Sequence, residues 1–206
     1  VYKRQVQDPV LINTVFDKLA KSSGSDCACS GWINRSLGTQ GESSTASGDS
    51  VLKFDNNEPD HIYQEFEVTP NANYQIEVEV SFKANAGKSN PSSLEFRVLA
   101  GTGYDTGYTP TYYTETTAFP QDGYGYSSVA QTEVEANNLM TKVLNNPDDT
   151  SYIKYILNFN SGANNSVALF VRGIGGLATG SSDNERYGYS SGDEEIRIDN
   201  LVITAL

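Results

Sequence analysis

The chain has 206 residues, 37% of them hydrophobic, and a formal net charge of −12 at pH 7. This length suits one large domain with a core of its own. The charge argues against a nucleic-acid partner, because phosphate binding needs clustered lysine and arginine. No apolar run approaches the ~18 residues that span a bilayer, so no membrane partner is expected either. An acidic surface suits a soluble secreted protein.

Residues 1–9 are interpreted as a linker and residues 10–206 as one domain in which strand signals dominate. Tyr74–Lys83 has the clearest pattern, with apolar and polar residues alternating along its length. Such a period of two predicts a strand with one buried face. Similar but shorter patterns recur from one end of the domain to the other. The expected strands, in chain order, are 11–17, 50–54, 61–68, 74–83, 94–99, 151–159, 167–172 and 196–203.

The only helix-like segment is Val134–Leu144, which is short and weakly amphipathic. Many short strands without alternating helices predict an all-β fold, an antiparallel β-sandwich. Two such strands open and close the domain. Each carries an acidic residue at its edge, Asp17 in the first and Asp199 in the last.

A tyrosine-rich insertion at 101–131 interrupts this pattern, with few aliphatic residues among its glycines, threonines and prolines. A long loop of this kind is usually functional or disordered, and its aromatic content disfavours disorder. A smaller cluster, Arg186–Tyr189, lies in another polar loop. These tyrosines either pack down on the sandwich or bind a ligand. In the insertion they are Tyr104, Tyr108, Tyr112, Tyr113, Tyr124 and Tyr126.

The two cysteines, Cys27 and Cys29, are separated by one residue. They are either a strained disulfide or two buried thiols. A zinc site is disfavoured, because structural zinc needs four ligands and His61 is the single histidine. A nucleophilic triad needs a general base, usually histidine, and the lone His61, beside Asp60, is interpreted as structural or solvated.

Paired carboxylates could perform glycoside hydrolysis, and the 26 acidic residues allow many pairs. Glu77 with Glu79, and Glu65 with Glu67, are the strand-borne examples. Because each pair lies on one face of a strand, a solvated face is the simpler interpretation.

Several short motifs resemble the carbohydrate-binding modules of the family 4, 16 and 22 group. Leu11–Asp17 resembles their Asn-Gly-x-Phe-Glu opening, with Thr14 in place of glycine and Asp17 in place of glutamate. Trp32, a Ser-Gly-x-x-x-Leu-Lys segment at 47–53, Gln64 and the final Ile198-Asp199-Asn200-Leu201 follow in the same order. The insertion from Gly101 has no counterpart in these modules.

The resemblance implies a jelly-roll sandwich of the galactose-binding-like kind, in which Trp32 is more naturally a core residue than a ligand platform. It also implies a structural Ca²⁺ between the two terminal strands. The carboxylates of Asp17 and Asp199 would bind it, since Ca²⁺ prefers oxygen ligands. The alternative is that these two residues merely cap strand ends.

The resemblance further implies a non-catalytic, secreted or cell-surface module that targets an appended catalytic domain to a plant or algal polysaccharide. An acidic polysaccharide such as alginate would suit arginine, which binds carboxylates and sulfates well. The alternatives are a polysaccharide lyase or glycosidase on the same fold, and a cell-surface adhesin domain. The expected ligand-binding residues are Arg97, Lys154 and Arg172, if they share a face, with Tyr112, Tyr124, Tyr126 and Tyr187. The alternative for each basic residue is a pair with Glu77, Glu79 or Glu95.

Overall fold

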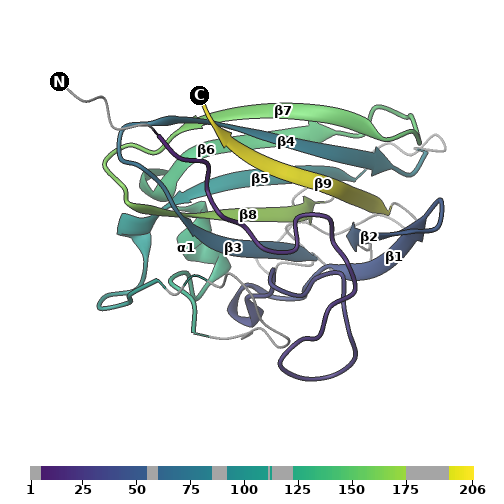
Figure 1. Ribbon diagram of the computed structural model, residues 1–206, viewed down its shortest axis with the longest axis horizontal. Helices are drawn as coiled ribbons and strands as arrows, with labels where there is room; N and C mark the ends of the chain where they lie inside the picture. The colour runs from purple at the N-terminus through teal and green to yellow at the C-terminus, as the bar shows by residue number, and fades with distance from the viewer. Residues whose placement is uncertain (1–5, 55–59, 85–91, 111, 113–122, 175–194) are drawn as a thin grey trace.

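The computed structural model describes residues 6–54, 60–84, 92–110, 112, 123–174 and 195–206 (Figure 1). Within these residues, two antiparallel sheets pack as a sandwich, so the predicted fold class is confirmed. One sheet has the order β1 (Glu42–Ala46), β2 (Asp49–Phe54), β9 (Ile196–Ala205), β4 (Asn73–Phe82) and β7 (Ile153–Asn160). The other has the order β3 (His61–Glu67), β8 (Ser166–Ile174), β5 (Ser93–Ala100) and β6 (Asn138–Asn145).

After the β1–β2 hairpin, the chain mostly crosses from one sheet to the other between strands, as in a jelly roll. The late strand β9 lies in the middle of its sheet, paired with β2 on one side and β4 on the other. Short helical segments complete the described part. They are α1 (Val129–Glu133) and the 3₁₀ turns η1 (Arg35–Leu37), η2 (Gly101–Gly103) and η3 (Glu135–Asn137).

The main core fills the space between the two sheets. The apolar residues of β4 that sequence periodicity placed on one face, such as Ile76 and Val78, are completely buried. Trp32 is a core residue too. Its ring lies 5.7 Å from that of Phe16, and its indole N–H donates to the carbonyl of Asn13 at 2.9 Å. The polar end of the ring is therefore satisfied without a ligand.

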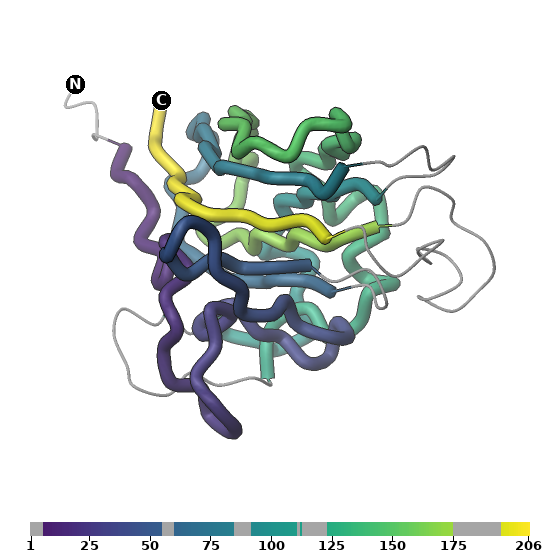
Figure 2. Tube along the Cα trace, turned by 90° about the vertical axis from the view of Figure 1, so that its right-hand side faces the viewer, coloured from purple at the N-terminus to yellow at the C-terminus, as the bar shows by residue number. Residues whose placement is uncertain are grey.

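The expected opening strand at 11–17 is wrong. Asn13 and Phe16 have positive φ angles of 50° and 52°, and the Phe16 N–H donates to the Asn13 carbonyl, so the chain turns there. The N-terminal segment nevertheless runs beside β9 (Figures 1 and 2), where the Leu201 N–H donates to the Thr14 carbonyl. Residues 6–9, which belong to the expected linker, lie against the sandwich. Asp8 accepts a hydrogen bond from the Ala205 N–H, and Val6 packs against the core.

The expected helix at Val134–Leu144 is also wrong, because most of it is strand β6, paired with β5. Pairing with β5 satisfies its backbone, and it places Leu144 against the core. The helix instead comes earlier, where Ser128 and Gln131 form a reciprocal capping box that starts α1.

Cys27 and Cys29 form a disulfide, which decides between the two states expected for this pair. Both are buried near the Ser43 side chain, whose hydroxyl accepts from the Ala28 N–H. Among the described residues, no helix is long and apolar enough to cross a membrane.

Candidate functional site: a tyrosine-walled pocket at one end of the sandwich

Over β3, β8 and β5, the outer face of the four-stranded sheet is buried rather than open. Tyr63, Leu99, Ala168 and Phe170 form a second, smaller core on this face, outside the main one. Leu37 of η1 and residues of the insertion cover it, with Tyr126 at the centre and Tyr104, Tyr124 and Val129 at its border. The insertion therefore occupies the sheet surface that an exposed binding face would need.

Two of the tyrosines expected to bind ligand are part of this cover. Tyr126 is completely buried, and its hydroxyl donates to the Ala100 carbonyl at 2.7 Å. The Tyr124 ring lies edge-on to Tyr63, with ring centres 5.5 Å apart. For these two side chains the structure agrees with packing on the sandwich. Tyr112 is half-buried, and Tyr187 lies outside the described residues.

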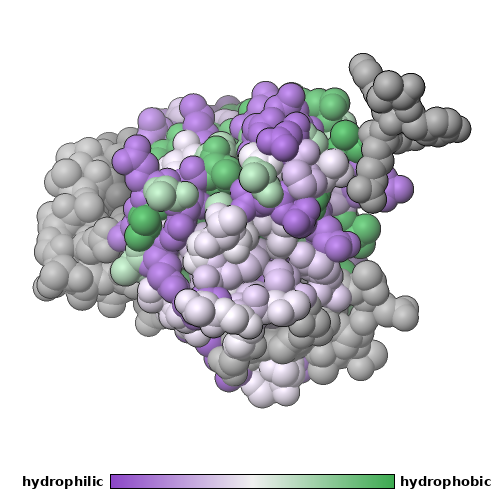
Figure 3. All heavy atoms as spheres, turned by 90° about the vertical axis from the view of Figure 1, so that its left-hand side faces the viewer, coloured by the Kyte–Doolittle hydropathy of each residue, from purple (hydrophilic) through white to green (hydrophobic). Residues whose placement is uncertain are grey.

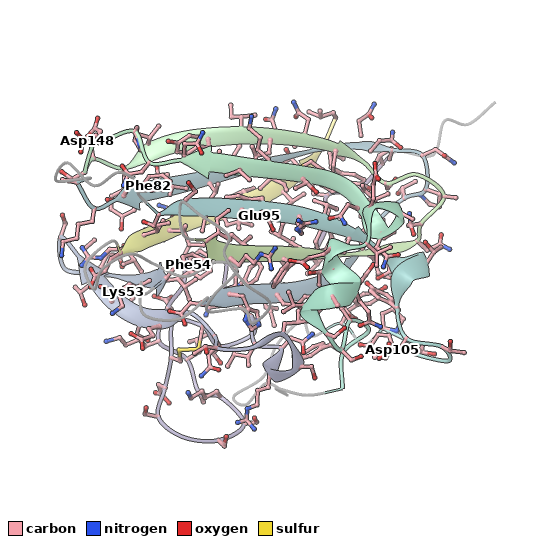
Figure 4. The ribbon with its side chains drawn as sticks, turned by 180° about the vertical axis from the view of Figure 1, so that it is seen from behind. Lys53, Phe54, Phe82, Glu95, Asp105 and Asp148 are labelled. Carbon is pink, nitrogen blue, oxygen red and sulfur yellow. A yellow bond between two sulfur atoms is a disulfide. The ribbon has the colours of Figure 1, made fainter. Side chains whose placement is uncertain are left out.

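Arg97 and Arg172 do share this face, but both guanidinium groups form ion pairs with carboxylates of this protein. Arg172 is only 2% exposed, and its guanidinium contacts Glu95 at 2.9 Å and Glu133 of α1 at 3.0 Å. Arg97 binds Glu95 through two nitrogens and also donates to the Asn138 side chain. Glu95 lies near the middle of the sheet (Figure 4). The two guanidinium groups thus neutralise internal carboxylates instead of forming a basic stripe.

Lys154 does not share a face with these arginines, so the expected grouping of the three is wrong. It lies on β7, in the other sheet, where it is paired in register with Glu79. Its ammonium nitrogen lies 3.1 Å from Glu77. As expected, Glu77 and Glu79 are on a partly solvated strand face.

Glu65, in contrast, is not on a solvated face. It is 6% exposed and accepts three hydrogen bonds, from the Tyr63 hydroxyl at 2.5 Å, the Tyr108 hydroxyl at 2.8 Å and the Gly125 N–H at 2.8 Å. Burial raises the pKa of Glu65, and these donors oppose that effect. This carboxylate therefore ties two parts of the insertion to β3.

A pocket of about 250 Å³ lies between the first part of the insertion and the β7–β8 loop, with Tyr108, the partner of Glu65, in its lining. These loops are at the left-hand end of the sandwich in Figure 1. Figure 3 turns this end to the viewer and shows a broad area of intermediate hydropathy there. Asp105, at the same end, lies far from Phe82 and Lys53 (Figure 4). We call this 250 Å³ pocket the rim pocket. Its lining is Gly101, Thr102, Tyr104, Tyr108, Pro110 and residues 163–166.

Hydrogen bonds and close packing fix the walls of the rim pocket. The Tyr104 hydroxyl lies 2.8 Å from the Ser166 hydroxyl, and the Tyr104 ring packs edge-on against Tyr108 and Tyr126. A Cβ on Gly125 would collide with the Tyr104 ring, so a glycine is needed for this approach. Asn164 accepts from the Thr102 N–H and holds the two loops together. The pocket is thus preorganised, with aromatic faces and polar groups side by side.

The predicted Ca²⁺ ligands lie in an acidic part of the surface. Burial raises the pKa of Asp199, and the negative charges of Asp49, Glu79 and Asp17 raise it further. This clustering of oxygen ligands favours a cation. However, no group of three or more histidine, cysteine, aspartate and glutamate side chains in the described residues is arranged to hold a metal ion. Asp17 and Asp199 therefore fit Ca²⁺ in their charge and in the type of their ligand atoms. Carbonyl or water oxygens would have to complete the coordination of the ion.

His61 is buried, in agreement with a structural role. Its Nε2 lies 2.9 Å from the Asn34 carbonyl, and its side chain is next to Phe170 and the cross-strand neighbour Arg172. Burial lowers the pKa of His61 to about 4, so the ring is neutral at pH 7. It lies in the covered face, away from the lining of the rim pocket.

Comparison with known proteins gives similarity at the level of three-dimensional structure. No family model and no curated protein matches the chain. Similar solved structures include a family 4 carbohydrate-binding module, with 9% identity and a TM-score of 0.49 over 95% of this chain and 99% of that one. The CBM22-1 xylan-binding domain of Paenibacillus barcinonensis Xyn10C has 13% identity and a TM-score of 0.47 over 98% and 97%. The K1 adhesin domain of Porphyromonas gingivalis Lys-gingipain has 11% identity and a TM-score of 0.42 over 86% and 95%. At these values the similarities do not separate one function from another, and the geometry of the site must do so.

Proposed function

We propose that this protein is a non-catalytic carbohydrate-binding module and that the rim pocket holds the sugar. The observation that carries this proposal is the pairing of two tyrosine faces, Tyr104 and Tyr108, with polar groups of the β7–β8 loop around one cavity. Sugar rings present apolar C–H faces, on which aromatic rings stack, and hydroxyls, which amides and hydroxyl groups bind. A small number of polar groups that converge on an otherwise apolar pocket is typical of small-molecule sites.

We further propose a neutral sugar rather than an acidic one such as alginate. The described lining of the rim pocket contains no lysine or arginine. The adjoining charges are negative, because Glu65 lies behind Tyr108, and both Glu65 and Glu67 act on Tyr112. With a net charge of −12 as well, an anionic sugar would be repelled unless a cation bridged it to the protein.

An enzyme on the same fold is the second candidate, and one observation favours it. Glu65 is a buried carboxylate of raised pKa that contacts the wall residue Tyr108 of the rim pocket, and a raised pKa near a pocket is a frequent property of catalytic acids. Yet its oxygens accept three hydrogen bonds, one of them from the wall residue Tyr108. This arrangement suits a carboxylate that holds a wall in place better than one that approaches a glycosidic bond.

A secreted or cell-surface location, an appended catalytic domain and a structural Ca²⁺ are also part of this proposal. The disulfide between Cys27 and Cys29 is compatible with an oxidising compartment. The support for the metal is the acidic environment of Asp199. Asp17 and Glu79 repel its carboxylate, and a bound cation would relieve this repulsion.

The experiment is affinity electrophoresis on neutral and acidic polysaccharides, beside assays for new reducing ends and for unsaturated uronate absorbance. Retardation by a neutral polysaccharide without bond cleavage supports the proposal. Tyr108→Ala should abolish the retardation. Tyr152→Ala, which changes an exposed tyrosine before β7, should not. Cleavage would establish the enzyme instead, and retardation only by acidic polysaccharides would contradict the neutral ligand.

A further inference from the structure

The rim pocket is closed on the side that faces the sheet. Tyr104 forms this side, and directly behind it Tyr126 is completely buried, with ring centres 5.5 Å apart. The Tyr126 hydroxyl is bonded to Ala100, and the rest of the second core continues behind the ring. A glycan in the pocket therefore has no path along the outer face of the four-stranded sheet.

The pocket is also closed in the direction of β3. There the hydrogen bond between Tyr108 and Glu65 forms a barrier. Beyond this barrier, the hollow lined by Glu65, Tyr112 and Tyr124 has a volume of only about 10 Å³. A space of this size holds about one water molecule and no sugar ring.

Away from the sheet and from β3, the pocket is open to solvent. Thr102, Ala163 and Asn165 line it there, and all three are exposed. The volume of about 250 Å³ is below the ~300–1,000 Å³ of most sites for drug-sized ligands, so it suits one or two sugar rings. A glycan that enters from solvent meets Tyr104 on the sheet side and the Tyr108–Glu65 bond on the β3 side, and it cannot continue past either. This arrangement suits a chain terminus, whereas a segment from the middle of a chain needs an exit at both ends.

We propose that the rim pocket recognises the ends of neutral glycan chains, an inference that rests on the proposed function. The insertion determines this preference, because its tyrosines fill the sheet face along which a longer chain would lie. Binding capacity on a polysaccharide then depends on the number of chain ends and not on the mass of polymer.

The test uses β-1,4-linked gluco-, xylo-, manno- and galacto-oligosaccharides, from the monosaccharide to the hexasaccharide, in calorimetric titrations with the full chain. The parent polysaccharides are examined before and after mild endo-hydrolysis, which creates new ends at constant mass. Chain-end recognition predicts an affinity that stops rising after the disaccharide. It also predicts that the bound protein increases in proportion to the new ends.

An affinity that rises by about tenfold or more from disaccharide to hexasaccharide, with binding unchanged by hydrolysis, would overturn chain-end recognition and leave the carbohydrate-binding function standing. No binding to any of these glycans would overturn both. Tyr108→Ala and its control Tyr152→Ala assign the binding to the rim pocket, because only the first changes its lining. If both variants bind like the parent, the glycan lies elsewhere and the inference fails.

Discussion

The Tyr108 hydroxyl donates to the Glu65 carboxylate at 2.8 Å, and this bond joins the wall of the rim pocket to strand β3. Because Glu65 also accepts from the Gly125 N–H, one buried carboxylate holds two parts of the insertion in place. The same side chain therefore contributes to stability and to the shape of the site.

Replacing Glu65 by glutamine should weaken glycan binding and stability together. The new amide keeps the size of the side chain but has only one acceptor oxygen, so at least one buried donor loses its partner. We expect a loss of about 1–3 kcal/mol in the free energy of unfolding. Glu67→Gln is the matched control, since Glu67 is exposed on the same strand. Denaturant unfolding and titration with the bound glycan measure both effects, and equal behaviour of the two variants would contradict the role of Glu65.

Tyr126→Ala should destabilise the fold strongly. The ring is completely buried in the second core, and loss of a large aromatic side chain from a core typically costs about 3–5 kcal/mol. Tyr152→Ala, at a position that is 37% exposed, should change the unfolding free energy by less than about 1 kcal/mol. If urea unfolding finds Tyr126→Ala as stable as the parent, the insertion does not pack on the sheet as described.

Replacing the basic residues Arg172 and Lys154 by methionine should lower the free energy of unfolding by different amounts, measured by urea unfolding. Arg172→Met removes the buried guanidinium that contacts Glu95 and Glu133, which should cost about 3 kcal/mol. Lys154→Met removes a pair that is largely in solvent, and its effect should be below about 1 kcal/mol. A small effect for Arg172→Met would show that its ion pairs do not hold the covered face together.

Stability should fall as the pH is lowered from about 6.5 toward 4, because of His61. Its pKa is about 4 in the folded protein, against 6.5 for the free side chain, so the unfolded state binds more protons in this window. The shift corresponds to a loss of about 3 kcal/mol when the window has been crossed. Unfolding free energies at several pH values should show this slope, and His61→Gln should flatten it. An unchanged slope in the variant would exclude His61 as its source.

Chelation tests the proposed Ca²⁺ site. A cation bound only to the folded state stabilises it, so EDTA should lower the melting temperature and added Ca²⁺ should restore it. Asp199→Asn should remove this response. An unchanged melt after EDTA, with no metal found by elemental analysis, would mean that Asp17 and Asp199 hold no structural metal.

Most of the fold could be predicted from the sequence, because one-sided burial leaves a visible period. Strand β4 shows this well, with alternate residues facing the core over its whole length. The wrong assignments fall where other forces decide. Positive φ angles at Asn13 and Phe16 turn a segment that alternates like a strand, and pairing with β5 makes a strand of the helix-like residues from Asn138.

The site was harder to predict, because it depends on contacts between distant segments. Glu65 looked like half of a solvated pair, and only the tertiary structure places Tyr108 and Gly125 against it. One signal of the covered face was present. The run Val167–Val171 is apolar without alternation, which is typical of a strand buried on both faces. This run predicts that another part of the chain covers the outer face of β8, without identifying the insertion as that part.

The position of β9 between β2 and β4 has a consequence for biosynthesis. Its partners are made long before it, so the edges of β2 and β4 that pair with β9 stay open while the ribosome synthesises the middle of the chain. During that time their unpaired edges and the apolar side chains of β4 are exposed, a state in which nascent β proteins associate wrongly. Completion of the sheet must wait until β9 has emerged, and chaperone protection in that interval should affect the yield of folded protein more than the speed of its synthesis.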